Sequence, residues 1–159
     1  MSIRVGLVLA TLAAAFALPA RAAAQLGVGA HYAHFADAFG GVTGAGARVT
    51  LGLPLIPITA AANGEYFFPR CGSGDCALRG ATFDLNVSLP FFALRPWAGV
   101  GWSVRRIEMG VNRRTERGMN VGVGAELGLV GLRPFVDLRY ELTEAPENQF
   151  LARLGVMLR

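Results

Sequence analysis

Lysine is absent from this chain of 159 residues, and cysteine and histidine each occur only twice. All fifteen basic residues are therefore arginine, which we attribute to genomic bias rather than to function. The two cysteines have no further cysteine nearby to complete the four ligands of a structural zinc site. We expect neither a metal ion nor a cofactor.

Long apolar runs are absent after residue 25, although hydrophobic residues make up 53% of the chain. A helix needs about 20 consecutive apolar residues to cross a bilayer. The one long apolar run, residues 5–18, follows Arg4 and is followed by Pro19 and several small residues. This three-part order is that of a secretory signal peptide. We therefore expect residues 1–24 to be cleaved and residues 25–159 to form one exported domain.

A large net charge is also lacking once the signal peptide is set aside. The formal charge of +4 includes Arg4 and Arg21, and without them thirteen arginines stand against eleven acidic residues. The basic pI of about 9.8 is therefore no indication of nucleic-acid binding, and we expect no nucleic-acid partner.

What the chain does have is a strict alternation of apolar residues with polar residues or glycine. In residues 119–129, apolar side chains occupy the odd positions, and Asn120, Glu126 and three glycines occupy the even positions. A period of two places successive side chains on opposite faces of a strand. No helical period occurs between such segments, so we predict an all-β fold.

Eight segments carry this alternation. They are residues 25–35, 42–53, 56–68, 79–89, 96–107, 118–129, 133–143 and 149–159. Each is about as long as a tilted membrane-spanning strand, which needs about 9–11 residues. We therefore predict an eight-stranded antiparallel up-and-down transmembrane β-barrel over residues 25–159.

The connections between the segments alternate in kind. Those after the second, fourth and sixth segments are compact and apolar, as in Leu53-Pro54-Leu55. The other four are more polar and generally longer, namely residues 36–41, 69–78, 108–117 and 144–148. Outer-membrane barrels have short periplasmic turns and longer extracellular loops. We therefore expect four extracellular loops, with both termini in the periplasm.

Alternation alone does not decide which row of side chains faces water, because a periplasmic lipocalin-like binding barrel would bury the apolar row. The polar rows are rich in small residues such as Gly99, Gly101 and Ser103, which suit a cramped interior. Their charges are nearly balanced, and enclosed charges must pair because desolvation of a lone ion is costly. The predicted lumenal charge network consists of Arg48, Glu65, Asp84, Arg105, Glu126, Asp137, Arg139, Glu141 and Arg153. The alternative interpretation is a solvated face of scattered charges.

The fifth segment opens with Arg95-Pro96-Trp97-Ala98-Gly99-Val100-Gly101, and Leu94-Arg95-Pro96-Trp97 recurs as Leu132-Arg133-Pro134-Phe135. With these motifs, its strand count and its unequal connections, the chain resembles the small eight-stranded outer-membrane barrels of the OmpA and OmpX kind and the related opacity-type surface proteins. The resemblance covers residues 25–159. It implies a location in the cell outer membrane and a structural or surface-interaction role.

One departure from that family lies at the end of the last strand. Family members end it on an aromatic residue, which the barrel-assembly machinery reads, whereas this chain ends in Met157-Leu158-Arg159. The partners implied are still this machinery, outer-membrane lipid and lipopolysaccharide, and we expect a monomer. Five arginines between residues 105 and 117 suit either a plain exposed loop or electrostatic contact with anionic lipopolysaccharide.

Two other activities remain as alternatives. An envelope lipid-modifying barrel enzyme would need a nucleophile or base. The candidates for these roles are His31, His34, Asp37, Ser73 and Asp75. Nothing in their spacing brings them together, so we expect no catalytic residue and no enzymatic activity. A channel would need a wider lumen, because eight strands leave an interior that side chains can fill.

The two cysteines, Cys71 and Cys76, flank a short polar stretch. An exported chain meets an oxidising compartment, so we predict a disulfide between them. The loop-entropy model gives only about 2 kcal/mol for so short a ring. We therefore expect the disulfide to close a loop tip rather than to hold the barrel together.

Overall fold

The computed structural model describes residues 25–37, 40–52, 56–70, 76–89, 91, 93–128, 131–143 and 149–159. The predicted signal peptide, residues 1–24, lies outside the described residues. None of the described segments forms a helix with the length and apolar character needed for a membrane span.

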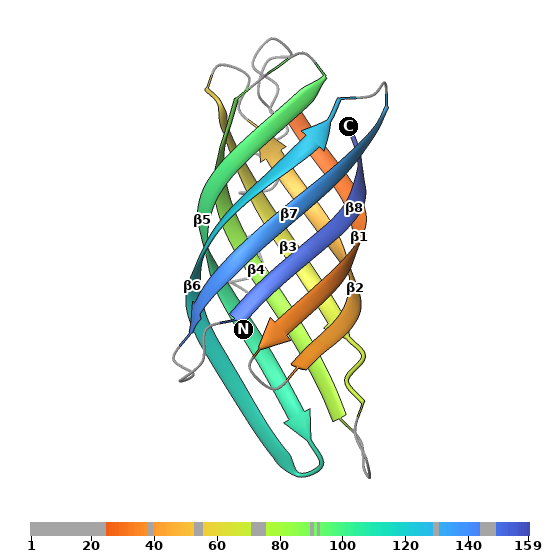
Figure 1. The fold of residues 1–159 in the computed structure, drawn as a ribbon, viewed down its shortest axis with the longest axis vertical. Helices are drawn as coiled ribbons and strands as arrows, with labels where there is room; N and C mark the ends of the chain where they lie inside the picture. The colour runs from red at the N-terminus through yellow and green to blue at the C-terminus, as the bar shows by residue number, and fades with distance from the viewer. Residues whose placement is uncertain are drawn as a thin grey trace, which may run out of the picture.

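Eight antiparallel strands form one closed barrel, in which neighbours in sequence are neighbours in space and β1 pairs with β8 (Figure 1). The strands are β1 (Gln25–Asp37), β2 (Gly40–Gly52), β3 (Ile58–Phe67), β4 (Cys76–Ser88), β5 (Leu94–Met109), β6 (Asn112–Leu127), β7 (Leu132–Thr143) and β8 (Gln149–Leu158). The predicted all-β, eight-stranded up-and-down barrel is confirmed. Closure leaves no unpaired sheet edge, which is the condition for a sheet to exist in lipid.

The two ends of the barrel carry different parts of the chain (Figure 1). The first residue of β1 and the last residue of β8 lie at the upper end of Figure 1. We name this end of the barrel the termini end, after these two strand ends. At the opposite end β5 and β6 project beyond the other strands as a long hairpin, and we name this the hairpin end. The predicted topology would place the termini end in the periplasm.

Residues 108–117, which the sequence predicts as a loop, belong instead to this hairpin. β5 runs to Met109 and β6 begins at Asn112, so that only Gly110 and Val111 form the turn. Gly110 has a φ of 57°, the left-handed conformation that suits the first position of a two-residue hairpin turn. The loop prediction was wrong because it relied on apolar alternation, which ends at residue 107. The hydrogen-bonded pairing of two strands that are already held together continues beyond that point.

The link predicted at residues 36–41 is shortened for the same reason. β1 and β2 stay paired as far as Asp37 and Gly40, which leaves residues 38–39 between the two strands. Two of the four links at the hairpin end therefore have only two residues between their strands, and the predicted contrast in link length between the two ends does not hold for them.

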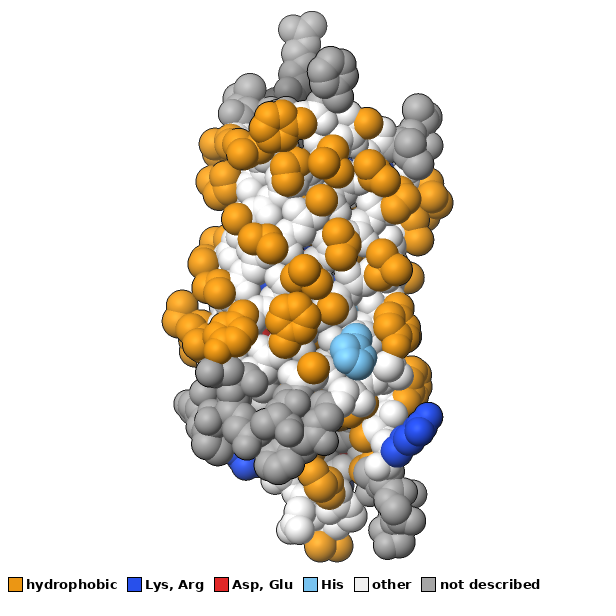
Figure 2. All heavy atoms as spheres, viewed as in Figure 1, with side chains coloured by type: hydrophobic (Ala, Val, Ile, Leu, Met, Phe, Trp, Pro, Cys, Tyr) orange, Lys and Arg blue, Asp and Glu red, His pale blue; other side chains and the backbone are white. Residues whose placement is uncertain are grey.

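An apolar belt covers the outside of the barrel. Its members include Phe83, Leu85, Val100, Trp102, Val121, Val123, Leu138 and Leu154. Val123 is 56% exposed, whereas the inward-facing Asn120 is fully buried. Figure 2 shows hydrophobic side chains spread over the described part of one face, with the prominent arginine side chains toward its lower end. A lipocalin-like barrel has the opposite arrangement, so that alternative is wrong for this fold.

Glycines inside the barrel make room for large polar side chains of the neighbouring strand. Gly101 lies opposite Asp84 in the β4–β5 register, and Gly122 lies opposite Arg139 in the β6–β7 register. A Cβ atom on Gly101 would collide with the Asp84 carboxylate, and one on Gly122 would collide with the Arg139 side chain. The glycine-rich rows therefore do not leave the lumen empty, because the opposing side chains occupy the space.

Candidate functional site in the barrel interior

The inward-facing row of every strand carries polar or charged side chains. All nine residues of the predicted lumenal charge network are buried, with exposed fractions of 6% or less. These residues are Arg48, Glu65, Asp84, Arg105, Glu126, Asp137, Arg139, Glu141 and Arg153. They lie in three layers along the barrel axis, which we describe from the middle outward.

Asp137 of β7 is the centre of the middle layer. Its Oδ2 accepts hydrogen bonds from Nη1 of Arg48 at 2.9 Å and from Nη1 of Arg153 at 3.0 Å. Its Oδ1 accepts one from Nε of Arg139 at 2.9 Å. One carboxylate thus joins guanidinium groups from β2, β7 and β8 across the lumen, and such charge-assisted hydrogen bonds are the strong ones.

Two further carboxylates complete the charge balance of this layer. Nε of Arg153 donates to Glu65 at 2.8 Å, which ties β8 to β3. Asp84 lies 3.6 Å from Nη1 of Arg139 and 3.9 Å from Nη1 of Arg153. Three arginines therefore face three carboxylates, which satisfies the requirement that buried charges be paired.

Neutral polar side chains fill the remaining positions of the middle layer. Asp84 accepts hydrogen bonds from Asn63 at 2.9 Å, from Thr82 at 3.0 Å and from Asn120 at 3.1 Å. Arg139 donates to Asn120 at 3.1 Å and to Asn86 at 2.6 Å. These four neutral residues were not predicted as members of the network. Their positions in the inward-facing rows of their strands could have indicated it.

The layer toward the hairpin end is built on one ion pair and two aromatic rings. Arg105 of β5 and Glu141 of β7 approach to 2.6 Å. The guanidinium carbon of Arg105 also lies 4.0 Å from the ring centroid of Phe35 and 5.5 Å from that of Phe67. The arginine is therefore held by charge on one side and by aromatic faces on another, which is a favourable site for a guanidinium group.

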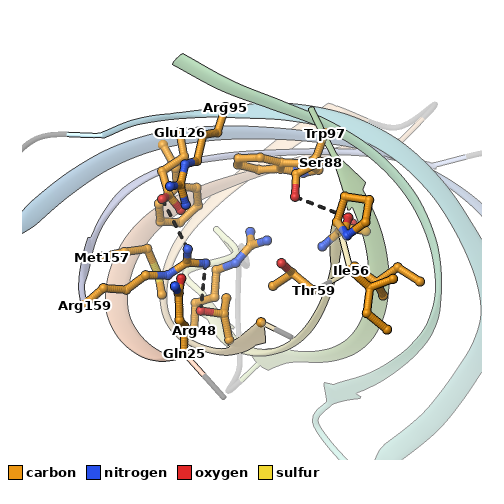
Figure 3. A pocket seen from close by; sticks show the side chains of 16 residues that line it. Gln25, Arg48, Ile56, Thr59, Ser88, Arg95, Trp97, Glu126, Met157 and Arg159 are labelled. Carbon is orange, nitrogen blue, oxygen red and sulfur yellow. Dashed lines mark hydrogen bonds and ion pairs between the residues drawn. The ribbon is translucent and has the colours of Figure 1, made fainter. Parts of the chain in front are cut away.

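The layer toward the termini end surrounds a cavity of about 310 Å³ (Figure 3). Glu126 of β6 lies 3.0 Å from Arg133 and 3.5 Å from Arg159. The innermost lining residues are Arg48 and Asn86, which are hydrogen-bonded to Asp137 and Arg139. The cavity is therefore a blind pocket whose floor is the middle layer.

The residues considered for enzymatic chemistry do not meet in the described part of the chain. His31 is buried, with Nε2 3.5 Å from the Glu65 carboxylate and its ring edge-on to Phe135. His34 is only partly buried and lies on the opposite, outward-facing row of β1. Ser73 and Asp75 lie outside the described residues, as does the side chain of Asp37.

The predicted disulfide cannot be placed in full. Cys76 is the first residue of β4, and Cys71 lies outside the described residues. The link between β3 and β4 thus has one cysteine at its edge, as the prediction requires. Pairing of Cys71 with Cys76 stays a prediction.

An outward-facing group of arginines lies on the hairpin end, which we name the basic band. Its members are Arg79 of β4, Arg106 of β5, and Arg113 and Arg117 of β6. Arg79 lies directly opposite Arg106 in the register, and all four are exposed. Arg106 has an ion pair with Glu108 at 2.7 Å, whereas Arg113 and Arg117 have none among the described residues. The band therefore carries excess positive charge beside the apolar belt.

Solved structures with this fold include barrels from several bacteria. Neisserial surface protein A is 17% identical, with a TM-score of 0.65, and the match covers 85% of this chain and 97% of that one. The N-terminal β-barrel domain of Pseudomonas aeruginosa OprF is 17% identical, with a TM-score of 0.60, over 85% of this chain and 98% of that one. A major outer membrane protein from Thermus thermophilus is 15% identical, with a TM-score of 0.56, over 86% of this chain and 99% of that one.

Neither a protein-family model nor a curated protein sequence matches the chain. At identities this low, the likeness to the solved barrels establishes the fold alone. The predicted resemblance to small eight-stranded outer-membrane barrels is confirmed at that level.

Proposed function

We propose that the protein is an outer-membrane barrel with a closed, charge-paired interior and a structural or surface-interaction role. The observation that carries this proposal is the distribution of side chains: apolar residues lie outside and charged residues lie inside, the reverse of a water-soluble protein. Large apolar side chains such as Phe83 and Val123 are more than half exposed, while arginines such as Arg139 are fully buried. An aqueous solvent would penalise this arrangement, whereas a bilayer stabilises it.

In this proposal the hairpin end faces the cell surface and the termini end faces the periplasm. Export through the predicted signal peptide and insertion by the barrel-assembly machinery are parts of it. The protein would insert as a monomer and display its four hairpin-end links outward. No enzymatic activity is assigned, because the histidines occupy separate faces of β1.

Membrane fractionation tests the location. We expect the protein in the outer-membrane fraction, resistant to salt and carbonate extraction. On a gel without prior heating, the folded barrel should migrate differently from the heated sample, because a closed barrel keeps its shape in detergent. Recovery in the soluble periplasmic fraction would contradict the proposal.

The partner that the outer surface favours is lipopolysaccharide. The basic band lies beside the apolar belt, at the height where the phosphate groups of lipid headgroups would meet the barrel. Arginine forms bidentate hydrogen bonds with phosphate, and clustered positive charge adds long-range attraction. We expect the purified barrel to bind lipopolysaccharide more weakly as salt rises, since these charges are exposed and screened.

Matched variants test this partner. The double variant Arg106→Gln/Arg117→Gln removes two charges of the basic band and should weaken lipopolysaccharide binding several-fold. The control Arg114→Gln removes an exposed arginine of β6 that pairs with Glu116 and lies outside the basic band, and it should leave the binding unchanged. Equal loss in both variants would show that binding follows total charge and not the basic band.

A further inference from the structure

The blind pocket at the termini end has a size and a lining that suit a small ligand. Its volume of about 310 Å³ lies at the lower end of the range of ligand pockets, which is about 300–1,000 Å³. Arg48, Arg95, Trp97, Glu126 and Arg159 line it together with several apolar residues. Because its floor is closed by the middle layer of the charge network, the pocket opens only toward the termini end.

The charges around the pocket are unbalanced, unlike those of the middle layer. Among the described side chains, Arg95, Arg133 and Arg159 have one carboxylate near them, that of Glu126, which contacts both Arg133 and Arg159. The pKa of Arg159 is lowered, mainly by burial; Glu126 opposes this shift, whereas the positive charges of Arg133 and Arg95 add to it. Three guanidinium groups thus share one counter-charge, and an incoming anion would relieve their mutual repulsion.

Buried hydrogen-bond donors without a partner point to the same ligand. Among the described residues, Nε1 of Trp97, Nε of Arg159 and Nε of Arg133 are buried and donate no hydrogen bond. Trp97 and Arg159 belong to the pocket lining itself. An unsatisfied buried donor costs about 1–3 kcal/mol, so acceptor oxygens supplied by a ligand would be favourable here.

The pocket has an apolar side opposite these charges. Figure 3 shows Arg95, Glu126 and Arg159 together on one side of the pocket and Ile56 on the other. Pro57 also lines the pocket beside Ile56, which is 48% exposed at the mouth. A ligand that spans the pocket would therefore present an anionic group to the arginines and an apolar group to Ile56.

We propose that the pocket at the termini end binds a small amphiphilic anion, with a carboxylate or phosphate monoester head beside Arg95, Arg159 and Trp97 and a short apolar tail against Ile56 and Pro57. Guanidinium groups bind both kinds of head in a bidentate manner, so the two heads share one chemistry. The binding site is distinct from the basic band, which lies at the opposite end of the barrel.

Tryptophan fluorescence provides a direct readout, because the chain has two tryptophans and only Trp97 lines the pocket. Trp102 faces outward in the apolar belt, so Trp102→Phe leaves Trp97 as the single reporter. The folded Trp102→Phe protein in a nonionic detergent is titrated separately with hexanoate, hexyl phosphate, hexanol and hexylammonium. We expect a saturable change in Trp97 emission with hexanoate or hexyl phosphate, and the tighter of the two identifies the head. Hexanol should bind at least about tenfold more weakly, because it lacks the charge-assisted hydrogen bonds.

Two variants in the same Trp102→Phe background separate binding from folding. Arg95→Gln should weaken anion binding about tenfold through loss of a charge-assisted hydrogen bond. Ile56→Asp places a negative charge at the exposed mouth and should weaken it too, with the barrel intact by gel mobility. The matched control Arg117→Gln, in the basic band, should leave it unchanged. The proposal is overturned by a response that does not saturate, by equal binding of hexanol, or by variants at Arg95 and Ile56 that bind like the parent.

Discussion

Arg105 and Glu141 form a two-pronged ion pair across the lumen: Nε of Arg105 donates to Oε2 of Glu141 at 2.8 Å and Nη2 donates to Oε1 at 2.6 Å. Both side chains are at least 98% buried, so water screens the pair very little. The pair joins β5 to β7 across the intervening β6 and fixes the relative position of strands that share no backbone ladder.

A double-mutant cycle on this pair should show strong coupling. Glu141→Ala leaves the Arg105 charge buried without its partner, which costs about 3–5 kcal/mol in free energy of unfolding. Arg105→Ala should cost a similar amount, and the double variant should cost clearly less than the sum of the two. Urea unfolding of the barrel in lipid vesicles measures each value, and strict additivity would contradict the pairing.

Removal of an arginine from the middle layer should be far more damaging than removal of one from the hairpin. Arg139→Ala leaves the three buried carboxylates of the middle layer with two arginines and removes the hydrogen-bond donor to Oδ1 of Asn86 and of Asn120, so we expect a loss of about 3–5 kcal/mol. Arg113→Ala removes an exposed side chain of β6 and should change stability by less than about 0.5 kcal/mol. Comparable losses in both variants would argue against a structural role of the network.

A charge introduced into the apolar belt should be costly. Val123 faces outward near the middle of the barrel wall, and Val123→Arg should cost about 2–4 kcal/mol if that face meets lipid. Val111→Arg is the control, because Val111 is 97% exposed at the tip of the hairpin. Spin labels at residue 123 and at residue 59, which lines the pocket at the termini end, should report lipid and barrel interior respectively, and the reverse accessibility would contradict the proposed orientation.

The closed interior should conduct no ions steadily. The pocket at the termini end stops at Arg48 and Asn86, and the hydrogen-bonded middle layer lies beyond them. Planar-bilayer recordings of the wild-type protein should therefore show no large, sustained current. A stable porin-like conductance would mean that the network opens, and the protein would then be a channel.

The predicted disulfide has a separate test. Mass spectrometry of the exported protein without reductant should show Cys71 joined to Cys76. Replacement of both with serine should leave the barrel assembled and heat-resistant, since the bridge would contribute only about 2 kcal/mol of loop entropy. Two thiols that react with an alkylating reagent in the exported protein would rule the bridge out.

The alternation of residues along each strand allowed the inward-facing side chains to be predicted from the sequence. It does not identify which charged residues pair with one another. Arg153 and Glu65 were both placed inside, yet their contact joins β8 to β3 across the lumen. Such pairs depend on the stagger of all eight strands, which closure of the barrel sets and no local pattern encodes. The same limit explains why the pocket at the termini end was missed, because Arg95 belongs to β5 and Arg159 follows β8, and these two strands are not neighbours.

The hairpin end shows a different limit of the sequence. Apolar alternation marks only the part of a strand that lies against the belt, so residues 108–117 were predicted as a loop. The ladder between β5 and β6 nevertheless continues to the pair Met109 and Asn112. Backbone hydrogen bonds extend the hairpin there, and charged side chains such as Arg113 are compatible with it because residues 112–115 are exposed on both faces.

The position of a glycine opposite a large polar residue on the neighbouring strand has a consequence for how such a barrel can evolve. Gly101 lies against the Asp84 carboxylate, and Gly122 lies against the Arg139 side chain. A Cβ atom at Gly101 would also lie 2.6 Å from the backbone oxygen of Phe83, and one at Gly122 would collide with the backbone oxygen of Leu138, so a smaller residue at position 84 or 139 would not by itself make room. Both positions should therefore stay glycine among descendants of this sequence, while the outward row changes one residue at a time.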